Sequence, residues 1–239
     1  MSQEQQPRHA SAVILIRPAE SNGFEVLLTR RPDETAFLDE TYCFPGGALR
    51  KEDCSAAMLQ RSFGLAADTA RSIVGAHFNP QQALGFWAAG TRELFEKVGV
   101  LLAVSEAGRR LVPTKLDLAE KHTGVLTKVV SFHYLLESEG LLWDASRLVY
   151  FSHWQTPAET SPCIDMRFFL ALSPQDQTPL PASSEVEHSV WLTPDRALEL
   201  FGKDQLPMIF PTFTSLRTLA DFDSLESLSR EYRVNSARG

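Results

Sequence analysis

The sequence predicts an α+β fold. Short apolar, β-branched runs of strand length occur toward both ends of the chain, and amphipathic helical spacing occurs between them. The two kinds of segment mix without a regular βαβ alternation, a pattern that favours α+β layers. The 239 residues are 44% hydrophobic and 22% charged, which is an ordinary globular composition in a chain long enough to bury a sizeable core.

The N-terminal part is expected to contain three strands. After a polar tail at 1–10, apolar runs at 11–17 and 24–30 flank the turn-rich segment PAESNG and indicate a hairpin. A polar loop follows, and YCFPGG then predicts a third strand that ends in Pro45-Gly46-Gly47. Two consecutive glycines allow the backbone to approach a ligand closely.

Helices are expected through the middle of the chain. Residues 54–78 have helical spacing that Gly64 and Gly75 interrupt, and helical spacing recurs within 105–140. The other expected elements are strands at 148–154, 166–172 and 186–192, helices at 193–201 and from Pro211, and a tail at 223–239.

The composition excludes several classes of protein. A net charge of −7 argues against a general nucleic-acid-binding protein, since such proteins are basic. No apolar run approaches the ~18 residues of a membrane span, and no charged leader with a cleavage site is present. The three cysteines have no C-x-x-C spacing, so neither a disulfide framework nor a cysteine zinc site is expected. We expect a cytoplasmic protein without nucleic-acid or membrane partners.

The most informative segment is a helix predicted at 80–98, which starts at Asn79-Pro80. Its apolar residues fall on one arc, and Glu93, Glu96 and Lys97 fall on the opposite arc. The two glutamates are i,i+3 neighbours, and like charges at this spacing are unfavourable unless a cation lies between them. A divalent metal ion is one such cation and Lys97 is another. The alternative is a solvated helix face with one Glu93–Lys97 pair.

Together with the upstream glycines, this helix resembles the box of the Nudix hydrolase family, G-x5-E-x7-R-E-U-x-E-E-x-G-U, where U is a bulky apolar residue. Gly47 matches the first glycine, Arg92-Glu93-Leu94 matches R-E-U, Glu96 matches the first paired glutamate, and Gly99-Val100 matches G-U. Asp53 stands where the first glutamate is expected, and 38 residues instead of seven follow it before the arginine. This insertion resembles the branch that includes peroxisomal coenzyme A diphosphatases.

The resemblance implies a Nudix fold, in which a mixed β-sheet is sandwiched between helices, as one domain over 11–222. The inserted helical segment 54–78 and additional helices within 105–140 would extend this domain, leaving tails at 1–10 and 223–239. A long insertion beside a phosphate-binding loop is also well placed to act as a lid.

The resemblance further implies a metal-dependent hydrolase. Mg²⁺ or Mn²⁺ would be held by Glu93, Glu96 and the backbone carbonyl of Gly46 or Gly47, where it would polarise a diphosphate linkage and activate water. Lys97 departs from the family pattern, because it replaces the second paired glutamate, which is usually a metal ligand.

Other charged residues receive roles by the same resemblance. A further carboxylate comes from a loop before a late strand in the family, and Glu185 and Glu187 are the candidates. Arg92 is expected to pair with Asp53 or Glu52 across the insertion. The alternative for Glu185 and Glu187 is that they are solvated residues at a strand edge. The basic residues that flank the box and could collect phosphates are Arg30, Arg31, Arg50 and Lys51. The alternative for each of these four is a solvated surface position.

Three functional hypotheses stay open. The first is a metal-dependent hydrolase of nucleoside diphosphates linked to another moiety, acting on a nucleotide-like small molecule. The second is a nucleotide-binding or regulatory Nudix-fold protein that does not cleave its ligand, which Lys97 favours. The third is a scaffold whose inserted helices form a partner interface, for example in a homodimer.

A coenzyme A derivative is one candidate substrate. The coenzyme A signature of a related branch begins L-L-T-x-R and ends in F-P-G-G. The segment LLTRRPDETAFLDETYCFPGG matches both ends and the length between them. It departs at Ala36, where an arginine is expected, and at Glu40, where a glycine is expected.

Overall fold

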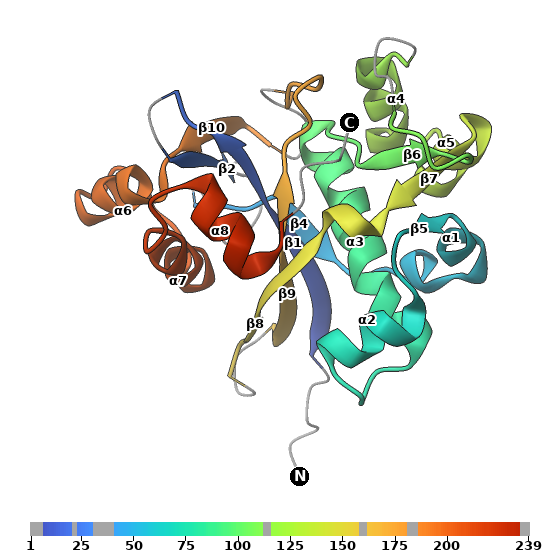
Figure 1. The fold of residues 1–239 in the computed structure, drawn as a ribbon, viewed down its shortest axis with the longest axis horizontal. Helices are drawn as coiled ribbons and strands as arrows, with labels where there is room; N and C mark the ends of the chain where they lie inside the picture. The colour runs from blue at the N-terminus through green and yellow to red at the C-terminus, as the bar shows by residue number, and fades with distance from the viewer. Residues whose placement is uncertain are drawn as a thin grey trace.

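Within the described residues, seven strands form one mixed sheet through the centre of the molecule (Figure 1). The computed structural model describes residues 7–20, 23–30, 41–111, 116–157, 162–180 and 186–234. The strand order is β10-β2-β1-β9-β8, with β3 paired to β2 and β4 paired to β1. The strands are β1 (Arg8–Pro18), β2 (Phe24–Arg30), β3 (Tyr42–Cys43), β4 (Gly46–Ala48), β8 (Val149–Gln155), β9 (Ile164–Leu172) and β10 (His188–Leu192).

The pairing of β1 explains why the sheet is mixed. β1 and β2 form the predicted antiparallel hairpin, with Ile16 opposite Val26. On its other side β1 runs parallel to β9, so that Ser11 lies opposite Arg167. The hairpin expected from the two N-terminal apolar runs is therefore confirmed.

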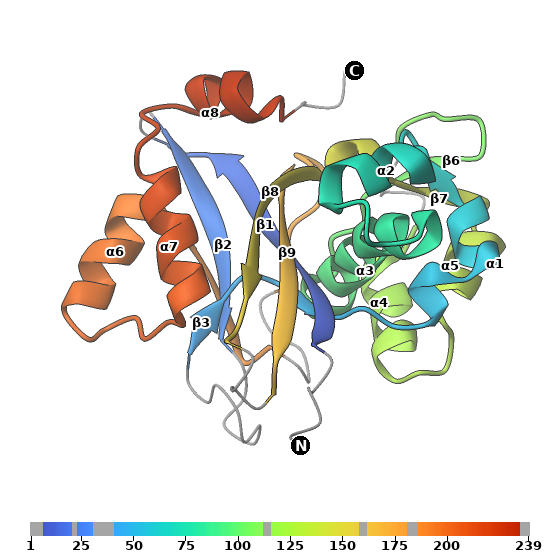
Figure 2. The ribbon, with the colours of Figure 1, turned by 90° about the horizontal axis from the view of Figure 1, so that it is seen from below.

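Helices lie on both sides of the sheet (Figure 2). In β1, Val13 and Leu15 face one hydrophobic core, and Ile14 and Ile16 face the other. The expected α+β fold with a mixed sheet between helices is confirmed. On one side lie α6 (Pro194–Gly202) and α7 (Phe210–Leu219), and on the other lie α1 (Ala56–Gln60), α2 (Ala67–Val74), α3 (Pro80–Val98), α4 (Leu118–Leu126) and α5 (Phe132–Ser138).

Most of the remaining expected elements are present with shifted bounds. The three late strands correspond to β8, β9 and β10, the two late helices to α6 and α7, and the helices expected within 105–140 to α4 and α5. No helix in the described parts of the chain is long and apolar enough to cross a membrane.

The inserted segment 54–78, whose helical spacing Gly64 and Gly75 interrupt, contains two separate helices and not one continuous helix. It forms α1, the two-residue strand β5 (Ser62–Phe63) and α2. The chain turns at Gly64, whose φ of +84° would strain any side chain. β5 pairs with β7 (Leu141–Asp144), which pairs with β6 (Ala103–Ser105). The insertion is therefore anchored in a second, three-stranded sheet.

Both ends of the chain contribute more to the fold than expected. β1 begins at Arg8, inside the expected tail at 1–10. The expected tail at 223–239 contains α8 (Leu225–Tyr232), and Leu228 of this helix is completely buried in the core that includes α7. The mostly polar composition of the segment favoured a tail, although its few apolar residues, such as Leu225 and Leu228, have helical spacing.

A buried ionic cluster joins β1, β8 and β9. Asp165 is 5% exposed, and its carboxylate lies 3.0 Å from His9 Nδ1 and 2.5 Å from His153 Nε2. It also accepts a hydrogen bond from Arg167, whose guanidinium lies over the ring of Phe86. Burial alone would raise the pKa of Asp165, but the hydrogen bonds from these partners hold that pKa well below its usual range.

We expect Asp165→Asn to lower the free energy of unfolding at pH 7 by ~3 kcal/mol, because Arg167 would remain buried without its anion. The folded-state pKa of Asp165 is depressed, so the wild type loses this stability as pH falls below the ordinary carboxyl pKa of ~4. Urea denaturation at pH 7, 4 and 3 should show the difference between wild type and variant narrowing at low pH.

The matched control is Asp176→Asn. Asp176 pairs with Arg110, but both side chains are well exposed, so the expected loss is below ~1 kcal/mol. Equal losses for the two substitutions, or a pH-independent loss for Asp165→Asn, would contradict the assigned role of the cluster.

Candidate active site

Helix α3 carries the two glutamates and is buried on almost every side. The side chain of Asn79 caps its start, and Gly99 ends it with a φ of +71°. Glu93 is 3% exposed and Glu96 is 6% exposed. The alternative of a solvated helix face therefore does not hold for Glu93 and Glu96. The reason is that α1, α2 and α4 also pack against α3.

Glu93 lies directly over the backbone of Gly47 in β4. A β-carbon at Gly47 would come within 2.4 Å of Glu93 Oε2, so any side chain there would displace the carboxylate. Gly47 pairs with Ser11 of β1, and Ser11 Oγ donates a hydrogen bond of 2.8 Å to the carbonyl of Phe86 in α3. Strand β1 thus positions both β4 and α3.

Arg92 connects α3 to the turn before the insertion. Its Nε and Nη2 donate hydrogen bonds of 2.7 and 2.8 Å to the two carboxylate oxygens of Asp53. Its Nη1 donates to Glu93 at 2.6 Å and to Glu96 at 3.1 Å. Burial opposes the charge of Arg92, but these three carboxylates raise its pKa further above the ordinary value. Asp53, and not Glu52, therefore pairs with Arg92 across the insertion.

Arg50 covers Glu96 at the edge of this cluster. Its Nη1 and Nη2 donate to the two carboxylate oxygens of Glu96, both at 2.8 Å, and Nη2 lies 3.8 Å from Glu93 Oε1. The side chain of Arg50 is 44% exposed. A guanidinium binds carboxylate and phosphate with the same two-pronged geometry, so Arg50 can exchange Glu96 for an anionic ligand.

The oxygen atoms gathered here suit a hard divalent cation. Glu93 and Glu96 supply carboxylate oxygens of the type that Mg²⁺ or Mn²⁺ accepts, and waters and phosphate oxygens would be the remaining ligands. In the described ranges, no group of three or more His, Cys, Asp or Glu side chains is arranged to hold a metal ion. The residues fit a metal ion that binds together with a phosphate-bearing substrate.

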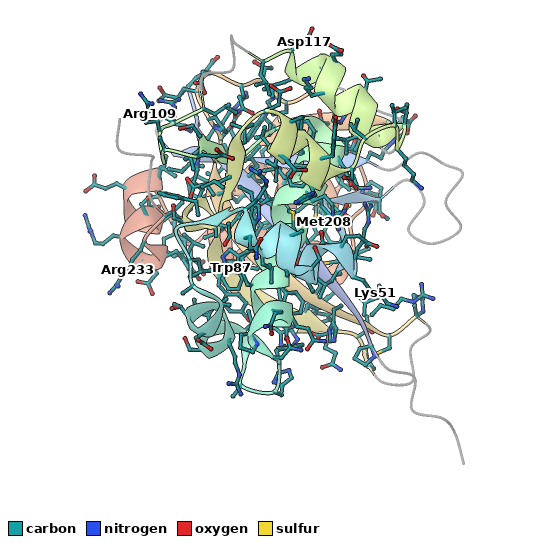
Figure 3. All side chains as sticks on the ribbon, turned by 90° about the vertical axis from the view of Figure 1, so that its right-hand side faces the viewer. Lys51, Trp87, Arg109, Asp117, Met208 and Arg233 are labelled. Atoms are coloured by element: carbon teal, nitrogen blue, oxygen red, sulfur yellow. The ribbon has the colours of Figure 1, made fainter. Side chains whose placement is uncertain are left out.

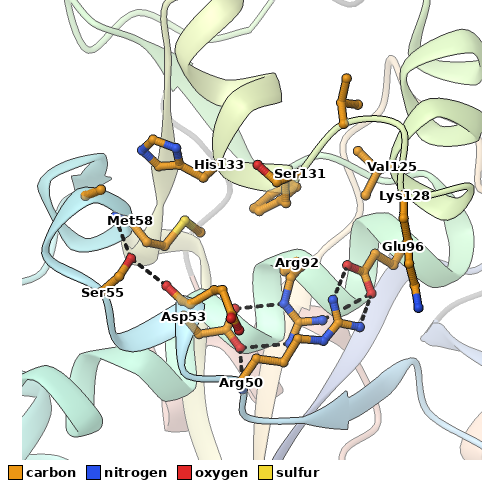
Figure 4. A pocket seen from close by; sticks show the side chains of 14 residues that line it. Arg50, Asp53, Ser55, Met58, Arg92, Glu96, Val125, Lys128, Ser131 and His133 are labelled. Carbon is orange, nitrogen blue, oxygen red and sulfur yellow. Dashed lines mark hydrogen bonds and ion pairs between the residues drawn. The ribbon is translucent and has the colours of Figure 1, made fainter.

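A cavity of about 460 Å³ opens beside Glu96 (Figure 4). One wall is charged and comes from α3 and the segment before α1. The other wall is mostly apolar and comes from α1 and the region of α4 and α5. The two walls include Arg50, Asp53, Arg92 and Glu96 on one side and Met58, Val125 and Phe132 on the other.

The other expected site residues lie elsewhere or outside the described parts. Arg30 Nη2 lies 2.7 Å from Glu187 Oε2, both side chains are partly exposed, and neither residue lines the cavity. Lys51 is exposed at the molecular edge and does not line the cavity either (Figure 3). Arg31 and Glu185 lie outside the described residues.

The sequence did not predict the cavity residues contributed by the region between α4 and α5. Lys128, Ser131 and His133 were not among the site residues expected from the sequence. All three line the cavity. Helical spacing within 105–140 predicted helices, but the spacing does not indicate which ends of these helices face α3.

Comparison with known families identifies the family of the chain. A family model described as the NUDT19 Nudix domain matches residues 7–219, which is most of the chain. The chain therefore belongs to the Nudix hydrolases. Within them, it belongs to the family of the NUDT19 Nudix domain.

Individual relatives are more distant. The chain is 25% identical to the acyl-coenzyme A diphosphatase NUDT19 of Gallus gallus over 87% of this chain and 64% of that protein. It is 26% identical to the Homo sapiens protein of the same name over 90% and 65%, respectively. The chain thus spans slightly less than two thirds of the length of these relatives. A solved Nudix hydrolase from Alicyclobacillus acidocaldarius superposes with a TM-score of 0.74 at 23% identity, covering 96% of this chain and 97% of that one, which supports the fold.

Arg92→Lys tests how strongly the buried cluster depends on the guanidinium. Lysine cannot make both bonds to Asp53, so buried carboxylates would lose partners, and we expect the free energy of unfolding to fall by ~2–4 kcal/mol. The matched control is Arg30→Lys, at a partly exposed pair with Glu187, with an expected loss below ~1 kcal/mol. Urea denaturation measures both, and similar losses would show that burial adds nothing at Arg92.

Proposed function

We propose that this chain is a metal-dependent pyrophosphohydrolase that cleaves the diphosphate linkage of a nucleoside diphosphate joined to another moiety. One observation carries the proposal: α3 places Glu93 over the backbone of Gly47 and Glu96 at the charged wall of the cavity. Membership of the Nudix hydrolases supports the same class of reaction.

The buried carboxylates would act as the metal ligands. Glu93, Glu96 and the carbonyl of Gly47 would hold Mg²⁺ or Mn²⁺, which supplies polarisation of the diphosphate and activation of a water molecule. Arg92 fixes the orientation of both glutamates through Nη1. A ligand set that is already oriented needs little rearrangement when the substrate arrives.

Arg50 is the expected basic residue that the cavity supports best as a phosphate ligand. Both of its terminal nitrogens donate to Glu96, and a diphosphate would compete for the same two donors. For Arg30, Arg31 and Lys51 the role in collecting phosphates stays a proposal that rests on their position near the box. The same holds for Glu185 and Glu187 as a source of a further carboxylate before β10.

The apolar wall supports a substrate that carries an apolar group beside its diphosphate. Met58 and Phe132 line the same cavity as the charged residues. The matched relatives are named acyl-coenzyme A diphosphatases, and an acyl-coenzyme A is a molecule of this kind. We therefore propose a coenzyme A derivative as the first substrate to test.

The alternative is a Nudix-fold protein that binds a nucleotide without cleaving it. Two observations favour it: Arg50 already neutralises Glu96, and lysine occupies position 97 in the last turn of α3. A cationic residue at that position replaces one carboxylate of the usual metal site and weakens the attraction for a divalent ion.

Hydrolysis of coenzyme A, acyl-coenzyme A and other nucleoside diphosphate derivatives should be detected with Mg²⁺ or Mn²⁺ and abolished by chelation. We expect Glu93→Gln and Glu96→Gln each to lower kcat by on the order of 10²-fold or more, because both remove a charge that the transition state requires. The control Glu199→Gln changes an exposed glutamate on α6 and should leave the rate unchanged. Unaltered turnover in both site variants would place the chemistry elsewhere.

Lys97→Glu separates the enzyme from the binding protein. The variant places a negative charge near the C-terminus of α3, so the metal-free protein should lose ~0.5–1 kcal/mol of stability. Mg²⁺ or Mn²⁺ should more than reverse this loss, which thermal unfolding with and without metal would measure. A weakened enzyme should gain rate at low metal concentration, whereas a binding protein should gain only metal affinity. If neither quantity increases, residue 97 does not occupy a metal-ligand position.

A further inference from the structure

The backbone of Lys128 adopts a conformation that glycine normally occupies. Its φ is +58°, in the left-handed region where a side chain crowds the following carbonyl group. Its N–H donates to the carbonyl of Val125, and the N–H of Val129 donates to the carbonyl of Gly124. These two bonds define a Schellman helix end, in which the residue at the position of Lys128 is usually glycine.

Local packing does not account for a side chain at this position. In a Schellman helix end, the residue after the left-handed one commonly packs against the last helical turn. That residue is Val129, which is 79% exposed. The apolar contact at this helix end comes instead from Val130, which lies beside Gly124 and packs against the hydrophobic core, and it does not involve the side chain of Lys128.

The side chain of Lys128 lies at the cavity beside the charged cluster. In Figure 4 it lies toward Glu96 and away from Asp53. Of the other two strongly basic side chains at the cavity, Arg92 is paired with Asp53 and Arg50 with Glu96. In the part of the chain that the structure describes, no salt bridge joins Lys128 to a carboxylate. Its charge is therefore available to an anion in the cavity.

A left-handed backbone alone does not indicate a site. Asp204 and Arg233 are the other non-glycine residues in the described ranges with positive φ, and neither lines the cavity. Aspartate tolerates this conformation because its side chain bonds locally, and Arg233 ends α8. Only at Lys128, within those ranges, does the conformation coincide with a cation at the cavity wall.

We propose that Lys128 is a substrate-binding residue that holds the diphosphate of the ligand against the charged wall, at the expense of helix stability. The inference rests on the proposed function, since it concerns the same cavity. A test of this inference needs variants that change the charge and the backbone strain at position 128 separately. Lys128→Gln removes the charge and keeps the strain, Lys128→Gly removes both, and Lys128→Arg keeps both.

The test measures the Kd of ADP with MgCl₂ by calorimetry, and the Tm without ligand. We expect Lys128→Gln to raise the Kd about tenfold with an unchanged Tm, as for the loss of one charge-assisted hydrogen bond. Lys128→Gly should raise the Kd equally and raise the Tm by about 2–4 °C. Lys128→Arg should stay near wild type in both. Asp204→Gly, the matched control for strain, should leave the Kd unchanged.

Three results would overturn the inference: no binding of ADP by the wild type, an unchanged Kd in Lys128→Gln and Lys128→Gly, or a fall in Tm in Lys128→Gln without a change in Kd. The last result would mean that Lys128 only stabilises the C-terminus of α4 by its charge. If the wild type binds ADP but hydrolyses nothing, and Lys128→Gln binds ADP more weakly than the wild type, the result supports this inference while contradicting the proposed function. Hydrolysis with an unchanged KM in Lys128→Gln would do the reverse.

Discussion

The ion pair between Arg92 and Asp53 is the interaction on which the candidate site depends, because it joins two parts of the chain that the insertion separates. Both side chains are almost completely buried and share two hydrogen bonds. Arg92 also donates to the carbonyl of Ala48, so one guanidinium contacts β4, the turn after it and α3. Removing the charge of Arg92 would leave Asp53 without its buried ion-pair partner in a poorly solvated position. The Arg92–Asp53 ion pair and the packing of β1 align β4 with α3, because the insertion separates these two elements along the chain.

Among the carboxylates and guanidiniums that the structure describes in the cluster, negative charges outnumber positive ones. Asp53, Glu93 and Glu96 contribute three carboxylates, whereas Arg92 and Arg50 contribute two guanidiniums. A buried excess of negative charge favours the approach of another cation. Arg50 is the exposed member of the set, so it is also the one that can turn to a substrate phosphate when a metal ion neutralises the glutamates. The proposed function and the alternative differ only in which cation takes this place.

Sequence patterns predicted the structural features that depend on neighbouring residues. They did not predict the contacts between segments that lie far apart in the chain. The caps of α3, the hairpin and the glycine strand each lie within a short run, so their positions followed from local rules. The helical arrangement of α3 showed that Glu93 and Glu96 share a face, but a helical pattern does not show whether other helices cover that face. The helical spacing of segment 54–78 and its interruption at Gly64 were predicted, but β5 was not, because a two-residue strand has no period.

The structure also changes the interpretation of the insertion, from a lid to a fixed wall. Trp143 of β7 is completely buried; its Nε1 donates to the carbonyl of Met58 at 2.9 Å and its N–H donates to the carbonyl of Arg61 at 2.9 Å. β7 follows α5 after a short turn, so the same tryptophan that fixes α1 also limits the movement of α5, which carries Phe132. Met58 and Phe132 are thus held by a buried core and not by mobile loops. A preformed apolar wall loses little entropy when a ligand binds. The insertion therefore sets the width of the cavity, and selection between substrates would reside in its apolar residues, while the charged wall supplies what all diphosphates share.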